Sequence, residues 1–360
     1  MLRRVAGTFY WMARNIERAE NNARIIAVRL GRIPGSWEEA AAATVYLRTT
    51  ANPDHRPDEK EAAADLGTDS LGGEREWEDL LEICASLADY RDTGLPMELE
   101  AILRYLTVSA HNPNSVLNCV ACARSNARSA SDAIPRELWE ALNDMYWNVK
   151  QAEDEPLATG DLHSFLQGVK QSSFTTQGVI ESLMPRGAPY LFVQLGKWLE
   201  RAEKTARILN VVCSNATKPG EWPHSRQYYH WLTALELVGG YDAFLRQYPP
   251  YMNTQDVLAF LVADPAFPRS IRYCVEHAIQ GLERLGEEGV SFESVKIGEA
   301  LRGLIEQSGE ARIREWPLYD LEKFLDRVQN DCNAAGALLT EALHSGGVTV
   351  ERDAMIYIQE

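Results

Sequence analysis

The chain lacks the short motifs that mark the common enzyme chemistries. It contains no glycine-rich phosphate loop, no G-x-S-x-G nucleophile elbow, no H-E-x-x-H metal motif and no second Cys-x-x-Cys pair. Its seven histidines show no repeated spacing. The sequence therefore gives little support to a nucleophilic enzyme, and no catalytic residue is assigned from it.

Cysteine is also scarce and scattered. Only Cys119 and Cys122 have the spacing of a metal or redox motif, but a structural zinc site needs four ligands, and His111 is the one histidine nearby. The other cysteines each lie in a segment with helical periodicity: Cys84, Cys213, Cys274 and Cys332. This usage predicts small buried side chains in a reducing compartment, with no metal or cofactor.

Long apolar runs and an excess of positive charge are missing as well. No run approaches the roughly 20 apolar residues that span a bilayer, and no basic leader precedes an apolar stretch. The 52 acidic residues outnumber the 36 basic ones, for a formal net charge of -16. This balance opposes non-specific nucleic-acid binding and favours a basic partner or a cationic ligand. We therefore expect a cytoplasmic protein whose partners include neither membranes nor nucleic acids.

What the chain does contain is the same pattern twice. The residues E-R-A-E-x-x-A-R-I occupy 17–25 and return at 200–208. Three further landmarks follow in the same order in both halves: Trp77, Leu81 and Glu82 against Trp231, Leu235 and Glu236; Pro113 to Val116 against Pro268 to Ile271; and Asp161 to Val169 against Asp320 to Val328. Such order predicts a tandem duplication. We expect one domain over 1–360, built from pseudo-symmetric halves at 1–183 and 184–346.

The first half is longer than the second between the first two landmarks. The excess falls near 49–74, where proline, glycine and charged residues dominate and apolar periodicity is absent. These features predict an inserted surface loop.

Helical periodicity dominates the rest of the chain. Apolar residues recur at spacings of three and four over 2–30, before Gly31 and Pro34, and again over about 189–212. Only the tail at 348–358 alternates in the manner of a strand. The fold class is therefore all-α, a helical bundle of two tandem halves.

The repeated pattern places charges beside an apolar helix stripe. On a helix, Glu17, Glu20 and Arg24 share one side next to Ile16 and Ala19, and the second copy does the same. Charges in that position are partly removed from water and need partners. The candidate residues are Glu17, Arg18, Glu20, Arg24, Glu200, Arg201, Glu203 and Arg207, with Arg3 and Arg186 as secondary candidates.

Two interpretations of these charges compete. In a salt-bridge lattice, Glu20 pairs with Arg24 and Glu203 with Arg207 along each helix, while Arg18 and Arg201 cross to the other copy. In a shared pocket, the four carboxylates bind a divalent metal or a substrate amine. The Glu-x-x-His motif of di-iron bundles is missing. Because an arginine stands close to every carboxylate, the lattice is favoured.

Two other features have conventional structural interpretations. The segments 112–115 and 264–270 combine an Asn, Asp or Ser with a proline just before a periodic run, which is typical of helix caps. Paired aromatics such as Tyr146-Trp147 are typical of core or interface anchors.

The motifs together resemble the bacterial alpha-E domain family. The matching residues run in the family's order through nearly the whole chain: 1–6, 10–14, 17–21, Ala23-Arg24, Asn112-Pro113 with Ser115, 123–128, 139–143 and 199–202. The sequence departs from the family pattern at Cys119 and Cys122 and in the longer loop. The resemblance implies an all-α protein, often encoded beside a circularly permuted ATP-grasp ligase and a transglutaminase-like protease. These systems are suspected of peptide or amide synthesis.

The resemblance and the missing enzyme motifs lead to one functional expectation. We expect an accessory or interaction subunit that binds an ATP-grasp ligase or its peptide substrate. The alternative is an enzyme of the same pathway, in which Glu17, Glu20, Glu200 and Glu203 serve as general bases or metal ligands and Arg24 and Arg207 orient a carboxylate.

Overall fold

The protein is helical throughout its described part. The computed structural model describes residues 2–31, 74–154, 159–216, 224–249, 252–291, 294–345 and 349–350. Within these ranges the only strands are two residues long each. The expected all-α class is therefore confirmed. The loop expected near 49–74 lies outside the described residues except for Glu74, and of the tail at 348–358 only 349–350 are described.

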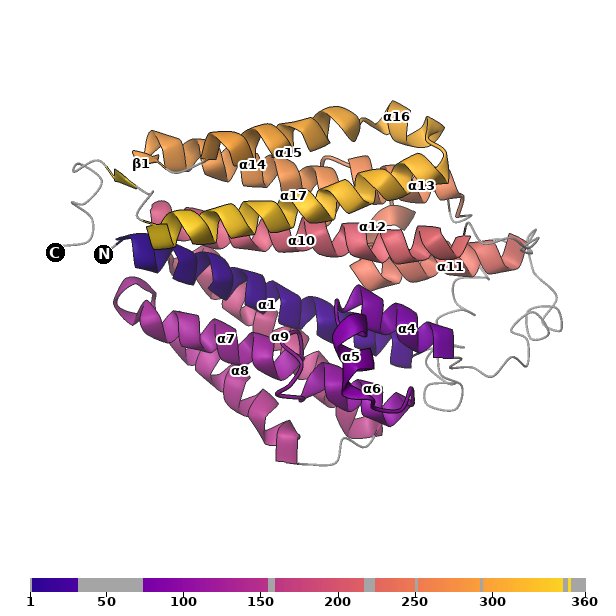
Figure 1. The fold of residues 1–360 in the computed structure, drawn as a ribbon, viewed down its shortest axis with the longest axis horizontal. Coiled ribbons are helices and arrows are strands. Elements are labelled where there is room, and N and C mark those ends of the chain that lie inside the picture. Colours follow the sequence, from indigo (N-terminus) through magenta and orange to yellow (C-terminus); the bar gives the residue numbers. More distant parts are fainter. Residues whose placement is uncertain are drawn as a thin grey trace.

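Two long parallel helices form the centre of the molecule (Figure 1). They are α1 (Leu2–Leu30) and α10 (Ala188–Ala216). Their direction follows from their contacts, because Tyr10 lies against Gly196 and, further along both helices, Asn22 lies against Lys204. A Cβ on Gly196 would stand 2.3 Å from the carbonyl oxygen of Tyr10. Glycine is thus what allows the two backbones to approach so closely.

Most of the segments that follow α1 pack on its lower side in Figure 1, while α4 lies at its right-hand end and also contacts α10. Helices α7 and α9 contact α1 directly, and α8 packs against both of them. The elements of this group are α4 (Glu74–Ile83), α5 (Leu87–Thr93), α6 (Leu99–Thr107), α7 (Val116–Ser129), the short η1 (Ser131–Ala133), α8 (Arg136–Asp154) and α9 (Thr159–Leu183).

The segments that follow α10 cover its other side. Helices α14 and α17 contact α10, α15 packs against both, and α17 also reaches α1 (Figure 1). The helices of this group are α11 (His224–Val238), α12 (Tyr241–Leu245), α13 (Thr254–Leu258), the π-helical η2 (Ala259–Ala263), α14 (Ile271–Glu287), α15 (Ser294–Gln307), α16 (Glu310–Glu315) and α17 (Leu318–Ser345). The strands β1 (Val290–Ser291) and β2 (Thr349–Val350) pair antiparallel.

Both proline-bearing segments begin helices, as their sequences predict. Ser115 caps α7 by accepting a hydrogen bond from the backbone N–H of Asn118, and Ser270 caps α14 by accepting one from Tyr273. Each cap satisfies one of the N–H groups that a helix start leaves without an intrahelical partner. The capping interpretation of these segments is therefore confirmed.

The turns after α4 and α11 also match each other. Ala85 has φ 55° and Gly239 has φ 75°, and each lies at the end of its helix. The residue after each donates a backbone hydrogen bond to the carbonyl five positions before it, at 2.8 Å after Ala85 and 2.7 Å after Gly239. This is the left-handed ending that many helices share. The match is local, and superposition of the two halves as wholes stays a prediction.

The cysteines serve mainly as packing residues. Five of the six are buried, among them Cys84 and Cys119, while Cys122 is exposed. Burial raises the pKa of the Cys84 thiol to about 11 and that of Cys119 to about 12. Cys122 departs from the expectation of burial because it occupies the outer side of α7.

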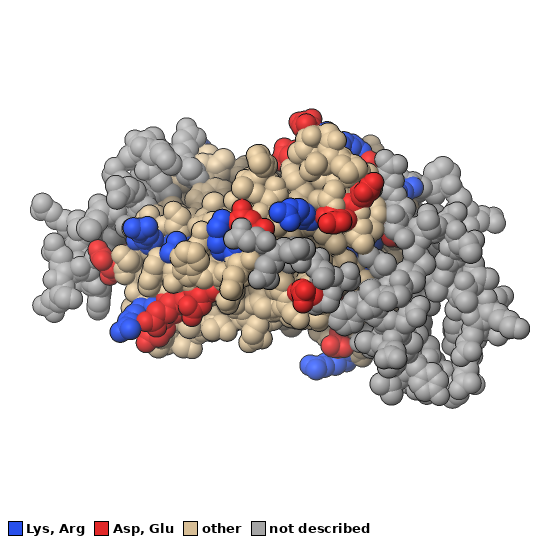
Figure 2. Space-filling view, turned by 90° about the horizontal axis from the view of Figure 1, so that it is seen from below, with Lys and Arg blue, Asp and Glu red and all other residues tan. Residues whose placement is uncertain are grey.

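Charge on the outer surface is scattered. In the view from below, acidic and basic side chains of the described part form small groups separated by uncharged ones (Figure 2). No described helix is both long enough and apolar enough to cross a membrane.

Candidate functional site

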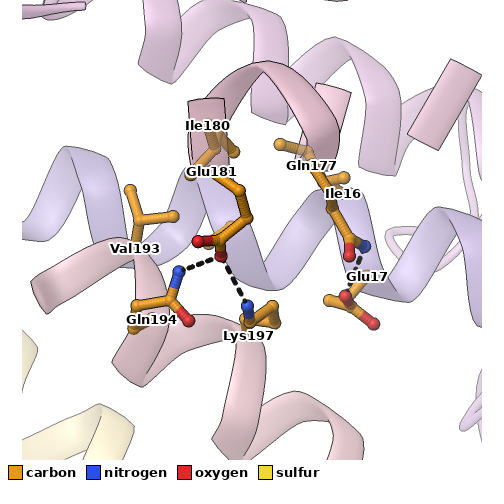
Figure 3. A pocket seen from close by; sticks show the side chains of 9 residues that line it. Ile16, Glu17, Gln177, Ile180, Glu181, Val193, Gln194 and Lys197 are labelled. Carbon is orange, nitrogen blue, oxygen red and sulfur yellow. Dashed lines mark hydrogen bonds and ion pairs between the residues drawn. The ribbon is translucent and has the colours of Figure 1, made fainter. Parts of the chain in front are cut away.

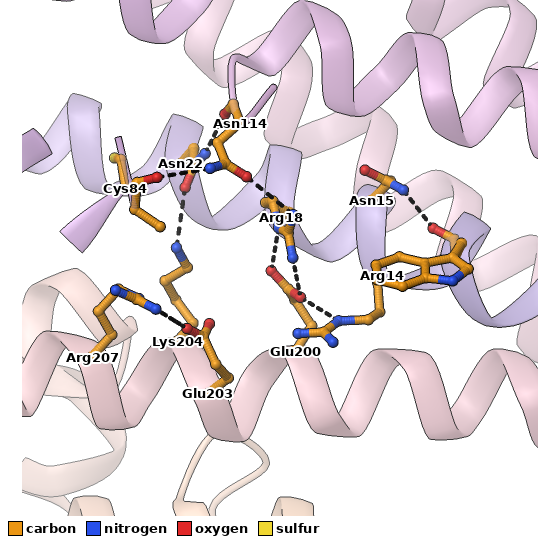
Figure 4. Close-up of polar contacts among 12 residues, drawn as sticks. Arg14, Asn15, Arg18, Asn22, Cys84, Asn114, Glu200, Glu203, Lys204 and Arg207 are labelled. Carbon is orange, nitrogen blue, oxygen red and sulfur yellow. Dashed lines mark hydrogen bonds and ion pairs between the residues drawn. The ribbon is translucent and has the colours of Figure 1, made fainter. Parts of the chain in front are cut away.

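The charged faces of α1 and α10 meet in a reciprocal contact. Arg18 donates from Nε and Nη2 to the two carboxylate oxygens of Glu200, at 2.7 and 3.0 Å (Figure 4). Arg201 donates from Nε and Nη2 to the two oxygens of Glu17, at 2.9 and 2.7 Å. Each Glu-Arg dipeptide thus grips the other in a bidentate fork. We use the name Glu-Arg ladder for the eight residues Glu17, Arg18, Glu20, Arg24, Glu200, Arg201, Glu203 and Arg207.

The other four ladder residues pair along their own helices. Glu20 accepts a hydrogen bond from Arg24, and Glu203 accepts one from Arg207 at 2.6 Å. Both pairs have the i,i+4 spacing that places side chains one turn apart on a helix. They therefore do not join α1 to α10. Among the ladder residues, the contacts between the helices are made by the first Glu of each copy and the Arg that follows it.

Further cations reach the ladder carboxylates. Arg14, one turn before Arg18, donates from Nε to Glu200 at 2.6 Å (Figure 4). Arg269 donates to Glu20 at 2.7 Å and to the side-chain oxygen of Asn21 at 2.6 Å. Sequence reasoning did not include Arg14 or Arg269 among the candidates. In the sequence, Arg14 is marked only by its position four residues before Arg18. Arg269 is marked only by its position in the repeated segment that begins at Pro268.

The two motif helices, α1 and α10, make corresponding hydrogen bonds to backbone carbonyl groups. One lies just before α7 and the other in the turn before α14. Asn22 donates to the carbonyl oxygen of Asn114 at 2.8 Å, and Thr205 donates to the carbonyl oxygen of Arg269 at 2.8 Å. The side-chain oxygen of Asn114 also accepts from Arg18 at 3.0 Å (Figure 4). The ladder is thus fixed at its edges by backbone groups.

Electrostatics keep two of the ladder carboxylates, Glu20 and Glu200, charged. Burial acts to raise the pKa of Glu20, but Arg269 and Arg24 outweigh it and hold that pKa below its usual range. Burial acts on Glu200 in the same way, and Arg18 and Arg14 hold its pKa well below the usual range. Carboxylates whose anionic form is so strongly favoured are weak proton acceptors near neutral pH.

Cations outnumber carboxylates in this buried region. Lys204 is 3% exposed, and its Nζ donates to the carbonyl oxygen of Ile83 at 3.0 Å and to Asn22 at 3.4 Å. Burial lowers the pKa of Lys204. Seven cationic side chains accompany the four ladder carboxylates: Arg14, Arg18, Arg24, Arg201, Lys204, Arg207 and Arg269. Such an excess of positive charge opposes a divalent metal ion.

A small cleft borders the ladder between α1, α9 and α10 (Figure 3). Gln177 donates to Glu17 at 2.5 Å on one side. On the other, Glu181 accepts from Gln194 at 2.8 Å and from Lys197 at 3.2 Å. The cavity of about 10 Å³ is the size of a single water molecule at most. It leaves no room for a substrate in this conformation.

Of the two secondary candidates, Arg186 lies apart from the ladder. Arg186 pairs with Glu181 at 3.3 Å and lies over the ring of Tyr190 at 4.2 Å. Its side chain is about half exposed. Arg3 lies in the first turn of α1, and its side chain lies outside the described part of the chain.

Metal ligands do not gather elsewhere in the described residues. Within those ranges, no three side chains of the His, Cys, Asp or Glu type come together in the way that a metal ion needs. The ladder carboxylates instead point at guanidinium groups.

One family model matches residues 1–342 of the chain, and it is described as a predicted alpha-helical domain with a conserved ER motif, named Alpha-E. No curated protein and no solved structure matches the chain. Two of the chain's Glu-Arg dipeptides, 17–18 and 200–201, form the reciprocal contact between α1 and α10. The resemblance that the sequence suggested is confirmed, and the chain belongs to the alpha-E domain family.

Proposed function

We propose that this protein is a non-catalytic interaction subunit that acts in the cytoplasm with an ATP-grasp-type peptide or amide ligase. The observation that carries the non-catalytic part is the burial of the Glu-Arg ladder. The carboxylates of Glu17, Glu20 and Glu200 are at most 1% exposed, and that of Glu203 is 6% exposed. Because no substrate can reach these buried carboxylates, we infer that they stabilise the fold and take no part in catalysis.

The geometry gives the ladder a specific structural role. Two parallel helices can slide along each other unless something fixes their register. Arg18 and Arg201 fix it, because each fork fits a carboxylate at one height only. Buried ion pairs contribute little net stability but can specify one arrangement over others. The ladder therefore keeps α1 and α10 in one fixed register. Binding of a partner is left to residues on the surface of the protein.

The alternative enzyme finds less support in this geometry. A metal-dependent or general-base role for Glu17 or Glu200 requires an open carboxylate, whereas both are held by bidentate arginines. The adjacent cleft has space for one water molecule at most. The support for an ATP-grasp ligase as the partner comes from the sequence resemblance, because domains of this family are often encoded beside such ligases.

The experiment is a reconstitution with the ligase encoded beside this chain's gene. We expect the two purified proteins to coelute in size-exclusion chromatography and ligase turnover to fall when this protein is omitted. Full ligase turnover without it, together with separate elution, contradicts the proposal. As a control for the enzyme alternative, Glu17→Gln should leave turnover unchanged per folded molecule. Magnesium or manganese should leave the unfolding midpoint unchanged.

A further inference from the structure

A second group of family-pattern residues lies outside the ladder. Arg124, Trp139 and Asn143 belong to the segments that carry the resemblance, and none of them contacts α10 through a side-chain hydrogen bond or ion pair. They come together between α7 and α8, where Nε of Arg124 donates to the side-chain oxygen of Asn143 at 2.8 Å. None of these three residues takes part in the scaffold role of the ladder.

Aromatic rings surround the Arg124 guanidinium. Its central carbon lies 4.6 Å from the ring centroid of Tyr146, 5.5 Å from that of Trp139 and 5.7 Å from that of Trp147. Tyr146 and Trp147 pack edge to face at 5.2 Å. On α8, Trp139, Asn143 and Tyr146 follow at spacings of four and three, so they form one stripe that faces α7. The stripe holds the guanidinium in place.

The held guanidinium has no acidic partner. Among the residues that the structure describes, no carboxylate lies within ion-pair distance of Arg124, and its hydrogen bond to Asn143 uses only Nε. The two terminal nitrogens remain available to an incoming group. A planar guanidinium with two free parallel donors matches a carboxylate.

The exposure of Trp147 and the residue types around Arg124 are typical of a protein interaction surface. Trp147 is 55% exposed, the second most exposed of the large hydrophobic side chains in the described part. Tryptophan, tyrosine and arginine are the residue types that dominate binding energy at protein interfaces. α8 also carries three exposed acidic side chains, Glu137, Glu140 and Asp144, of which Glu140 pairs with Arg136 at 2.7 Å. In the view from below, acidic and basic groups lie side by side (Figure 2).

We propose that Arg124, Trp139, Asn143, Tyr146 and Trp147 form a docking site for a protein segment that presents an Asp or Glu carboxylate beside an apolar side chain. The carboxylate binds the terminal nitrogens of Arg124, and the apolar side chain packs on Trp147. Asn143 is a positioning residue, because it holds Nε. The site deepens the proposed function by giving the surface on which a partner sits, yet it does not require that partner to be the ligase.

The test uses the full chain labelled with 5-fluorotryptophan and followed by fluorine NMR. The probe is the blocked peptide acetyl-Ala-Phe-Glu-Phe-Ala-amide, with Gln in place of Glu as its matched control. We expect saturable shifts of the Trp139 and Trp147 signals with the Glu peptide and at least about tenfold weaker binding of the Gln peptide, since a charge-assisted hydrogen bond contributes about 1.5 to 3 kcal/mol. The buried Trp231 signal should stay in place.

Two variants and a control separate docking from folding. Arg124→Gln should weaken binding of the Glu peptide about tenfold or more. Asn143→Asp supplies an internal carboxylate that pairs with Arg124, so it should also block the peptide while keeping the helices folded. Arg128→Gln removes the same charge from an exposed site one turn further along α7 and should change affinity less than about twofold.

Several outcomes overturn the proposal. One is the absence of any shift at Trp147, and another is equal binding of the Glu and Gln peptides. A third is unchanged affinity in both Arg124→Gln and Asn143→Asp. Binding of a single-stranded oligothymidylate that depends on Arg124, with no peptide binding, would assign the surface to nucleic acid and overturn it as well. Ligase binding that survives Arg124→Gln leaves the proposed function standing and places the ligase elsewhere.

Discussion

Arg18 holds Glu200 with two hydrogen bonds, although 182 positions separate them in the chain. The contact joins α1 to α10 inside the protein, and Arg201 and Glu17 repeat it with the helices exchanged. The Glu-Arg dipeptides thus contact each other and leave no open carboxylate. We therefore expect substitutions in the ladder to change the stability of the fold rather than to remove a chemical step.

Removal of one ladder arginine should strongly destabilise the protein. Arg201→Met leaves the carboxylate of Glu17 buried without its guanidinium, and we expect a loss of about 3 to 5 kcal/mol in the free energy of unfolding. A further Glu17→Gln should recover part of the loss, because it neutralises the stranded group. Urea denaturation of the parent, single and double variants measures both effects.

The control is an arginine whose pair is exposed. Arg302 and Glu283 are about half exposed, so Arg302→Met should cost less than about 1 kcal/mol. Equal midpoints for Arg201→Met and Arg302→Met would show that the ladder contributes no more than a surface ion pair.

Acid should weaken the fold through the same carboxylates. The folded-state pKa of Glu20 lies below its ordinary value of 4.5, because Arg269 and Arg24 outweigh burial. The ionised group therefore adds stability that is fully present above pH 4.5 and is lost as the pH falls through the folded-state pKa. Unfolding midpoints measured from pH 7 to pH 3 should drop below about pH 4.5, and less steeply in Glu20→Gln. The same slope in both proteins would refute the assignment to Glu20.

The close approach at Gly196 should be intolerant of any side chain. The added Cβ of Gly196→Ala would meet the backbone of Tyr10, which cannot turn aside, so we expect a loss of about 1 to 3 kcal/mol. Gly178→Ala is the matched control, since Gly178 lies in the long helix α9 with nothing within 4 Å of its added Cβ. That control should gain about 0.5 to 1 kcal/mol from better helix propensity. A thermal melt in which both changes have the same sign would contradict the packing described here.

How much the sequence predicted depends on how local each contact is. The pairs Glu20 with Arg24 and Glu203 with Arg207 follow from helix spacing alone, and the caps at Ser115 and Ser270 follow from a few adjacent residues. These features need no knowledge of the tertiary structure.

Long-range partners could not be predicted in the same way. Arg269 reaches Glu20 only because α14 packs on α10 beside α1, and no spacing rule links the two positions. Arg14 fits beside Glu200 because Gly336 on α17 leaves the space, where a Cβ would stand 3.0 Å from its Nη1. The duplication pointed to the right helices, but only packing reveals which cations share a carboxylate.

The turn after α4 offers a stabilising substitution. Ala85 is exposed and holds φ 55°, a conformation that costs an L-residue about 1 to 2 kcal/mol, while Gly239 holds the matching position. Ala85→Gly removes this strain but adds freedom to the unfolded chain, a loss of about 0.4 to 1 kcal/mol. We expect a net rise in the unfolding midpoint, with Gly239→Ala changing it in the opposite direction. A lower midpoint for Ala85→Gly would show that the turn carries no strain.

The proposed halves should recognise each other when made as separate chains. Fragments 1–183 and 184–360 divide the ladder, so Arg18 and Glu200 then sit on different molecules. Each motif helix buries its charged face against the other, and neither fragment can satisfy those groups alone. We expect a tagged first fragment to copurify the second in equal amounts after coexpression.

Charge exchange makes this last prediction specific to the ladder. Glu200→Arg in the second fragment places three arginines together with no carboxylate between them, since Arg14 and Arg18 both face that position. It should abolish copurification, because each buried cation loses its partner. Arg18→Glu in the first fragment then restores one carboxylate at the same height and should recover part of the complex, whereas the exposed change Arg128→Glu should not. If either fragment is recovered alone as a folded monomer, or if Glu200→Arg copurifies as well as the parent, the two helices are held together by their apolar faces and the ladder does not specify their pairing.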